Sequence, residues 1–189
     1  MDKKRQPLVN NSLKRWIDIH LCKPLVTWLW KEFEPLTEKD LQYWYILKRY
    51  FITQKIFRIN GPVPWPVDFR SQVVDWQSIS KDKKSYPGGS MGNYINAKGG
   101  LSLGTNVLIG PNTVISTTNH SISNPLNDGE KAGVVIGNNV WIASNCTIVA
   151  GANIGNNVTI GAGCYINNYI PDNTLVKQDK NNIILIPKK

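Results

Sequence analysis

The stretch VVIGNNVWIASNCTIVAGANIGNNVTIGAGCYI (Val134–Ile166) carries an isoleucine at every sixth position. A helical period of 3.6 would scatter these residues around the axis, whereas a simple strand would be apolar at every second residue. The spacing therefore predicts a three-sided coil, in which each side contributes one inward aliphatic residue and then turns a corner. The residues on this register are Ile136, Ile142, Ile148, Ile154, Ile160 and Ile166.

The same step continues upstream, where Leu103, Ile109 and Ile115 are also six residues apart. Glycine often follows the aliphatic residue, and small or β-branched residues fill the fifth position. We expect Gly and Asn to occupy corners with backbone angles that other residues avoid. The span 132–171 contains no formally charged residue, but its many Asn and Gly residues argue against a membrane span.

Three cysteines and the apparent lack of a secretory leader in MDKKRQPLV favour a reducing compartment, so we expect a cytoplasmic protein. Cys146 and Cys164 are 18 residues apart, which is one complete coil of three sides. They should stack about 4.8 Å apart as small interior thiols. No GxGxxG, P-loop, HExxH or paired CxxC motif is present, and no metal site is expected.

Residues 1–60 form a basic, aromatic-rich segment with 12 Lys/Arg against 6 Asp/Glu. We expect helices here, with Thr37 as an N-cap and a break or kink at Pro24. An apolar stripe is predicted after Thr37, from Leu41, Trp44, Tyr45, Lys48, Phe51, Ile52 and Ile56. A segment of this kind suits a membrane surface, a nucleic acid or a polyanionic glycan, or is an ordinary cap with solvated lysines.

The sequence divides into four regions. The helical segment covers 1–60, and a Pro-rich junction with the entry to the coil covers 61–78. The β-helix covers 79–171 and includes a loop at 121–135. A tail covers 172–189, and its NNIILIPKK stretch is expected to cover the last coil, as the helices are expected to cover the first.

These hexads, with GTNVLIGPNTVISTTNH (Gly104–His120), resemble the bacterial hexapeptide-repeat acyltransferases, and above all the sugar and polysaccharide O-acetyltransferase branch that includes galactoside acetyltransferase. The resemblance covers roughly residues 70–171. It implies a mainly β fold, a left-handed parallel β-helix preceded by a helical N-terminal segment. It further implies acetyl-CoA as the donor, and homotrimers with active sites between neighbouring subunits.

His120 is the candidate catalytic base. It is one of two histidines and ends the turn that Leu103, Ile109 and Ile115 begin, just before 15 extra residues leave the six-residue path. A neutral imidazole suits proton removal from a hydroxyl near pH 7. His20 is expected to be structural or a surface residue.

The resemblance assigns cofactor contacts to the WIGS-like stretch and to slim corners past which a pantetheine arm can pass. A backbone N–H near Ser144 would then face the oxyanion. Acceptor contacts fall on Asn93, which is imperfectly spaced, and on Asn119. The cofactor-binding candidates are Trp141, Ala143, Ser144, Ala162 and Gly163.

Two features depart from the family pattern. Asn167-Asn168 and KQDKNN (Lys177–Asn182) replace the segments that contact the nucleotide end, although Lys177 or Lys180 could meet phosphates. No acidic residue has an obvious spacing to orient His120, since Asp128 and Glu130 belong to the loop.

The sequence thus predicts an acetyl-CoA-dependent O-acetyltransferase acting directly on a sugar hydroxyl of a bacterial surface polysaccharide, such as capsule or lipopolysaccharide. The N-terminal segment would allow peripheral membrane contact, and no nucleic-acid partner is expected. The alternatives are an antibiotic O-acetyltransferase of the same superfamily and a non-catalytic β-helix that acts as a scaffold or binding module.

Overall fold

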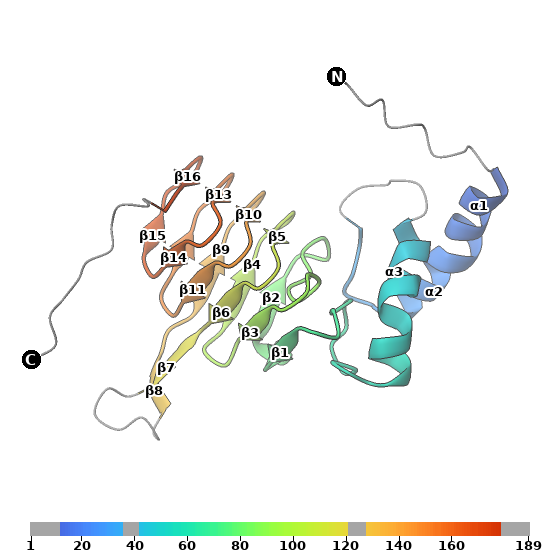
Figure 1. The fold of residues 1–189 in the computed structure, drawn as a ribbon, viewed down its shortest axis with the longest axis horizontal. Coiled ribbons are helices and arrows are strands. Elements are labelled where there is room, and N and C mark those ends of the chain that lie inside the picture. The colour runs from blue at the N-terminus through green and yellow to red at the C-terminus, as the bar shows by residue number, and fades with distance from the viewer. Residues whose placement is uncertain (1–11, 36–41, 121–127, 179–189) are drawn as a thin grey trace, which may run out of the picture.

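The computed structural model describes residues 12–35, 42–120 and 128–178, and its main body is a coil with three parallel sheets (Figure 1). We call the sheets faces A, B and C. Face A contains, in spatial order, β1 (Gln72–Val74), β3 (Tyr94–Asn96), β6 (Val114–Ser116), β11 (Thr147–Val149) and β14 (Tyr165–Ile166).

The other two faces complete each turn of the coil. Face B contains β2 (Ile79–Lys81), β4 (Leu101–Leu103), β9 (Val134–Ile136), β12 (Asn153–Ile154) and β15 (Tyr169–Ile170). Face C contains β5 (Leu108–Ile109), β10 (Trp141–Ile142), β13 (Thr159–Ile160) and β16 (Leu175–Val176). The predicted left-handed parallel β-helix is confirmed. Its first strand lies within the segment 61–78 that the sequence assigned to the junction, and its last lies beyond residue 171.

The isoleucines of the repeat share one interior, as predicted. Residues 18 apart pair directly across neighbouring coils, as Ile142 does with Ile160 and Ile148 with Ile166. All six isoleucines are buried, and they join the residues of the earlier coils in one hydrophobic core. Cys146 and Cys164 are buried free thiols in one column within this core.

The corners confirm in part the expectation that Gly and Asn are there for their backbone angles. Positive φ values fall on corner asparagines and on Gly100, Gly151 and Gly163, whereas the glycines directly after the inward aliphatic residue do not have them. Those glycines instead pack closely on the next coil: a Cβ on Gly137 would lie 2.7 Å from the carbonyl carbon of Gly155. The corner asparagines with positive φ are Asn106, Asn112, Asn139, Asn145, Asn157 and Asn173.

Asparagine side chains also connect the coils along the edge between faces B and C. The amide of Asn106 donates to the side chain of Asn139, which donates to that of Asn157, which in turn donates to Asn173. Each link is a side-chain hydrogen bond of 2.9–3.2 Å between consecutive coils. Because asparagine side chains are uncharged, the polar corners of successive coils stack without repulsion between like charges.

The helical layer lies at the end of the coil where β1 and β2 begin (Figure 1). It contains α1 (Ser12–Ile17), the π-helix η1 (Asp18–Cys22) and α2 (Lys23–Leu29), followed by α3 (Gln42–Tyr50) and the π-helix η2 (Phe51–Ile56). Pro24 does not split the first helix, because the wider π turn precedes it: the Lys23 N–H bonds back to the Asp18 carbonyl. Thr37 lies outside the described residues.

The predicted apolar stripe of α3 and η2 matches the buried face only in part: Phe51 packs against the core, and Leu41 lies outside the described residues. Trp44, Tyr45, Ile52 and Ile56 are more than half exposed. The buried face instead includes Tyr50 and the polar Gln54, with Tyr43, Ile46 and Leu47 packed against the core. The helix therefore has two apolar faces, and helical spacing does not show which of them is covered. None of the helices described is long and apolar enough to cross a membrane.

Buried polar groups connect the helical layer to the coil through the junction. The Gln54 carboxamide accepts from the Trp30 indole and the Val67 N–H, and donates to the carbonyls of Asn60, Val63 and Trp65. The Tyr50 hydroxyl donates to the Gly89 carbonyl at 2.8 Å. Together with the 3₁₀ turn η3 (Trp76–Ser78), this network fits the helices onto the first coil.

Asp68 forms ion pairs that connect the helical layer to the junction before the coil. Its carboxylate is 2% exposed and accepts from the guanidinium groups of Arg49 on α3 and Arg70. The hydrogen bond from Arg70 is the largest influence that lowers the pKa of Asp68, to about 2. This pairing holds the helical layer at the coil only while the carboxyl is ionised.

We expect Gly137→Ala to destabilise the coil by about 1–3 kcal/mol, because the added methyl group would meet the backbone of Gly155. Chemical denaturation followed by circular dichroism measures the loss. Ser102→Thr is the control, since it adds a methyl group at an exposed strand position and should change stability by less than about 0.5 kcal/mol. Equal effects of the two variants would contradict the close-approach explanation.

Asp68→Asn should lower stability near neutral pH by on the order of 2 kcal/mol. The folded-state pKa of Asp68 is below its ordinary value, so its contribution is present above pH 4. That contribution is lost as the pH falls from about 4 to about 2. Urea unfolding across this range should show the variant and the wild type converging. Asp75→Asn is the charge-matched control, because Asp75 has no ion pair among the described residues.

Candidate active site

The edge between faces C and A is built from narrow corners that stack over successive coils. Corners 110–113, 143–146 and 161–164 form it, and we call it the slim edge. The Gly163 N–H donates to the Ser144 carbonyl at 3.0 Å, and the Asn145 N–H donates to the Pro111 carbonyl at 3.0 Å. The structure therefore brings together four of the predicted cofactor residues: Ala143, Ser144, Ala162 and Gly163.

The side chains of Ala143, Ala162 and Gly163 are small, so little projects outward from this edge of the coil. Ala162 and Gly163 are exposed, and Gly163 has a φ of +76°. The Ala143 N–H bonds to the Ile160 carbonyl. In contrast, the Ser144 N–H has no acceptor among the described residues. Such an N–H beside a strip of small residues can donate to a carbonyl oxygen that passes over it.

Trp141 stands on face C next to the slim edge. It is 54% exposed and pairs in register with Leu108 and Thr159 on the neighbouring strands. Its indole thus lies on the outer surface of the coil. This position suits either a contact with a cofactor or a contact with a second subunit.

The chain leaves the coil at the edge between faces A and B, where the sequence predicts a loop at 121–135. The structure has a β-hairpin instead, formed by β7 (Thr118–His120) and β8 (Asp128–Lys131) in antiparallel pairing, and it projects away from the coil (Figure 1). The two strands form because the residues that leave the coil after Thr117 pair with the residues that return to it before Val134. The coil resumes at Val134, one residue before the predicted loop ends.

His120 is on this hairpin, with its backbone opposite Asp128. The turn 121–127 between the two strands lies outside the described residues. The backbone register brings His120 beside an acidic residue that the sequence assigned only to a loop.

Thr117 anchors the root of the hairpin. It is fully buried, and its hydroxyl donates to the Asn96 carbonyl at 3.0 Å and accepts from the Gly99 N–H at 2.7 Å. The Asn96 amide also donates to the Thr118 hydroxyl at 3.2 Å. Asn96 and Thr117 hold the base of the hairpin, and the sequence analysis did not single them out. The sequence signal that could have found them is the length of one coil. Asn96 pairs with Ser116, which lies at the same position one turn later and directly precedes Thr117.

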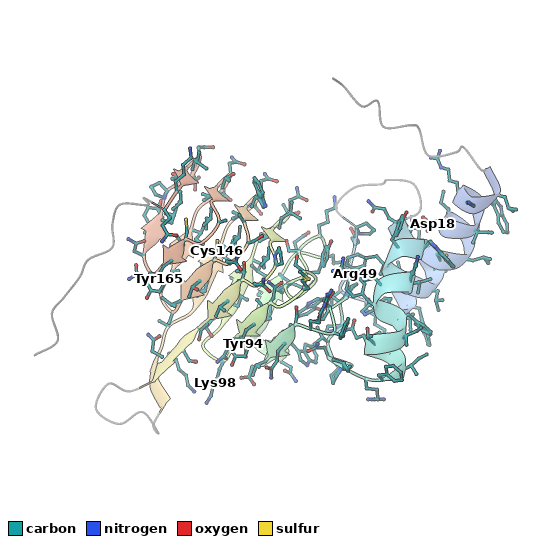
Figure 2. The ribbon with its side chains drawn as sticks, viewed as in Figure 1. Asp18, Arg49, Tyr94, Lys98, Cys146 and Tyr165 are labelled. Carbon is teal, nitrogen blue, oxygen red and sulfur yellow. The ribbon has the colours of Figure 1, made fainter. Side chains whose placement is uncertain are left out.

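His120 and the slim edge are on opposite edges of face A within one chain. Tyr94 and Tyr165 project from the outer surface of this face, and Lys98 lies toward the hairpin side (Figure 2). One side of the coil is six residues long, which corresponds to at most about 20 Å. The backbone of His120 and the four slim-edge residues therefore lie at opposite edges of one side of the coil.

The two predicted acceptor residues have different surroundings. Asn93 is 2% exposed and lies in the interior column that continues through Thr113 and Cys146. Its amide donates to the Gly110 carbonyl at 2.8 Å, as the Cys146 thiol donates to Gly161 one coil later. Asn93 is thus positioned as a structural residue, whereas Asn119 is exposed on the hairpin.

The remaining candidate groups are simpler. Burial raises the pKa of the Cys146 thiol, which opposes a nucleophilic thiolate. His20 is exposed and its ring lies 4.9 Å from that of Trp16. Within the three described ranges, no group of three or more His, Cys, Asp and Glu side chains is arranged to hold a metal ion. Lys177 is exposed one coil beyond Gly161, whereas Lys180 and the stretch 179–189 lie outside the described residues.

Comparison with known families identifies the repeat. The model of the bacterial transferase hexapeptide family, which comprises six repeats, matches residues 133–168. These residues are similar to bacterial transferase hexapeptide repeats. The hexapeptide repeat includes the slim-edge corners 143–146 and 161–164, and it begins just after the hairpin.

One relative and two solved structures are similar to this chain. Galactoside O-acetyltransferase from Escherichia coli (strain K12) is 42% identical over 78 residues, which are 40% of this chain and 38% of that protein. The chain thus matches less than two-fifths of the length of this relative.

The solved structures are more distant. A hexapeptide-repeat acetyltransferase from Vibrio cholerae O1 biovar eltor, complexed with acetyl coenzyme A, is 24% identical with a TM-score of 0.43, covering 56% of this chain and 62% of that one. A maltose O-acetyltransferase from Clostridium difficile 630 is 29% identical with a TM-score of 0.42, covering 58% and 56%.

We expect Thr117→Val to loosen the hairpin, because the Gly99 N–H loses its acceptor while the volume of the side chain is kept. The cost should be about 1–3 kcal/mol. Hydrogen–deuterium exchange should accelerate at residues 118–120 and 128–131. Thr147→Val on the outer surface of face A is the control, and unchanged exchange in Thr117→Val would show that Thr117 is not the anchor.

Proposed function

We propose that this chain is an O-acetyltransferase that moves an acetyl group from acetyl-CoA to a hydroxyl of a bacterial surface polysaccharide. The observation that carries the proposal is the hexapeptide repeat, flanked by a hairpin that bears His120 and containing the small residues of the slim edge. The similarity to a galactoside O-acetyltransferase supports a sugar hydroxyl as the acceptor.

In the proposed reaction, His120 acts as the general base. The imidazole removes the proton of the acceptor hydroxyl as its oxygen attacks the thioester carbonyl. The carbon–sulfur bond then breaks, and the imidazolium returns its proton to the leaving thiolate of coenzyme A. No acyl-enzyme forms, and the buried Cys146 and Cys164 take no part in the reaction.

The slim edge supplies the donor site in this proposal. A pantetheine arm that runs along Ala143, Ala162 and Gly163 would bring its thioester past the Ser144 N–H. That N–H would stabilise the negative charge that develops on the carbonyl oxygen. Trp141 would cover one side of the arm with its exposed indole.

The acceptor side belongs to the hairpin. Asn119 is exposed beside His120 and would contact the sugar, while Asn96 would act as a positioning residue through its hydrogen bond to Thr118. We do not place Asn93 at the acceptor, because its side chain is enclosed within the coil.

A complete site requires two copies of the chain. The hairpin of one subunit would lie against the slim edge of its neighbour, since the two features are on opposite edges of face A. A closed ring of three copies provides three such sites by one repeated contact. Because acetyl-CoA is an intracellular metabolite, the proposal places the enzyme in the cytoplasm.

His120→Ala should lower kcat by roughly 10²- to 10⁴-fold and leave acetyl-CoA binding nearly unchanged. Steady-state transfer to oligosaccharide acceptors, with release of free coenzyme A, measures kcat, and calorimetry measures binding. His20→Ala is the matched control and should retain activity. Near wild-type turnover in His120→Ala would remove the histidine from the mechanism.

The same assay tests the two-copy site. Ala162→Trp should block the donor edge, so each single variant alone should have only a small fraction of wild-type activity. Chains of His120→Ala and Ala162→Trp that are refolded together should regain a fraction of wild-type activity, because mixed assemblies pair an intact hairpin with an intact edge. No recovery in assemblies shown to be mixed would place the whole site within one chain.

A further inference from the structure

The helical layer carries a second apolar surface that the fold does not cover. More than half of the strongly exposed large hydrophobic side chains in the described residues are on this layer, and each is at least 40% exposed. Large apolar patches on the surface of soluble proteins mark sites that contact another protein or a membrane. The residues are Leu13, Trp16, Ile19, Leu21, Leu25, Trp28, Trp44, Tyr45, Ile52, Ile56, Phe57 and Ile59.

Packing within the chain does not account for this surface. The first helix already buries one stripe, including Asp18, Cys22 and Val26, against the rest of the protein. Trp16 and Trp28 are outside that stripe, and Trp28 is 70% exposed. The exposed aromatic residues are therefore additional to the apolar groups that stabilise the fold.

Basic residues are interspersed with these aromatic and aliphatic side chains. Residues 42–60 contain Lys48, Arg49, Lys55 and Arg58 and no acidic residue. Residues 12–35 add Lys14, Arg15, Lys23 and Lys31 against Glu32, Glu34 and Asp18, of which Asp18 is buried and accepts the Trp44 N–H, so positive charge exceeds negative charge on the layer. The surface is therefore complementary to an anionic one.

We propose that the outer surface of the helical layer lies on an anionic phospholipid bilayer. Trp and Tyr rings suit the boundary between headgroups and acyl chains, because each has an apolar body and a polar tip. Lys and Arg would contact the phosphates, as in helices that lie in the plane of a membrane. A protein partner fits less well, because lysine is depleted at the centres of protein interfaces.

The position of the layer is compatible with this contact. The helices are at one end of the molecule, whereas the hairpin leaves the coil farther along (Figure 1). A bilayer against the helices would leave the outer surfaces of faces A, B and C accessible. The inference does not depend on the proposed enzymatic function, and its test measures binding without any acetyl transfer.

The test is cosedimentation of the full chain with sucrose-loaded vesicles of phosphatidylglycerol and phosphatidylcholine, compared with vesicles of phosphatidylcholine alone. We expect binding to the anionic vesicles that decreases with added salt. Trp16→Ser/Trp28→Ser should reduce the partition coefficient at least about tenfold. Tyr169→Ser, an exposed aromatic on the coil, is the matched control and should bind as the wild type does.

Lys14→Glu/Lys48→Glu changes only exposed side chains and provides a second variant if the tryptophan variant fails to fold. Its partition coefficient should fall by roughly fivefold or more for each charge reversed. Circular dichroism confirms that each variant is folded. Absence of the wild type from the anionic pellet at low salt would overturn the proposal.

Sedimentation velocity separates the bilayer from a second copy of the chain. We expect the tryptophan variant to keep the wild-type assembly state, because its substituted surface would face lipid. A variant that dissociates into smaller species would show that another copy covers this surface, and would overturn the proposal.

Discussion

The short distance between successive coils governs the architecture of this protein. Parallel strands are hydrogen-bonded about 4.8 Å apart, so every side chain has a near neighbour directly above and below it. Each side sends two side chains into the interior, as Val140 and Ile142 do, and the corner that follows them must be slim. A Cβ on Gly110 would lie 2.7 Å from the carbonyl carbon of Ala143 in the next coil. Isoleucine fills the interior, glycine allows the close approach of the next coil, and asparagine adopts the positive φ of the corner. All three recur because the spacing between coils repeats.

That spacing also determines where function can arise. The interior is filled, and the outer surfaces of the strands are regular, so distinctive chemistry is left to the edges. The slim edge follows from the repeat itself, since its corners have the small residues that close stacking requires. The hairpin instead interrupts the repeat, and Thr117 marks the point at which the chain departs. The proposed reaction assigns one role to each kind of edge.

The repeat half could be predicted from the sequence because one short pattern, an inward aliphatic residue at every sixth position, recurs along it. The six isoleucines, the stacked cysteines and the corner residues around Ser144 all follow from counting in steps of six. Asn93 shows the limit of this method, since a polar residue inside the coil is stabilised by the Gly110 carbonyl, a partner 17 residues away. The hairpin was also missed, because the pairing of β7 with β8 depends on residues outside the repeat.

The helical half was predicted less well for a related reason. Trp44 and Ile52 have helical spacing, but so do Tyr43, Ile46 and Tyr50, and sequence alone does not rank two apolar faces. The buried face is chosen by long-range contacts, such as those of Gln54 with the junction. Pro24 was misjudged because a π turn can widen the backbone before it. These outcomes reflect tertiary contacts that no local pattern encodes.

The register of the coil has a consequence for how such a molecule can change in length. Equivalent backbone positions recur every 18 residues, so a whole turn could be gained or lost in evolution without altering the turns on either side. A single inserted residue within a turn would shift every later isoleucine out of the interior. Fifteen residues beyond the regular step are accommodated between Ile115 and Ile136 only because they leave at an edge and return to it. Variation among descendants of this chain should therefore occur as complete turns or as excursions from the edges.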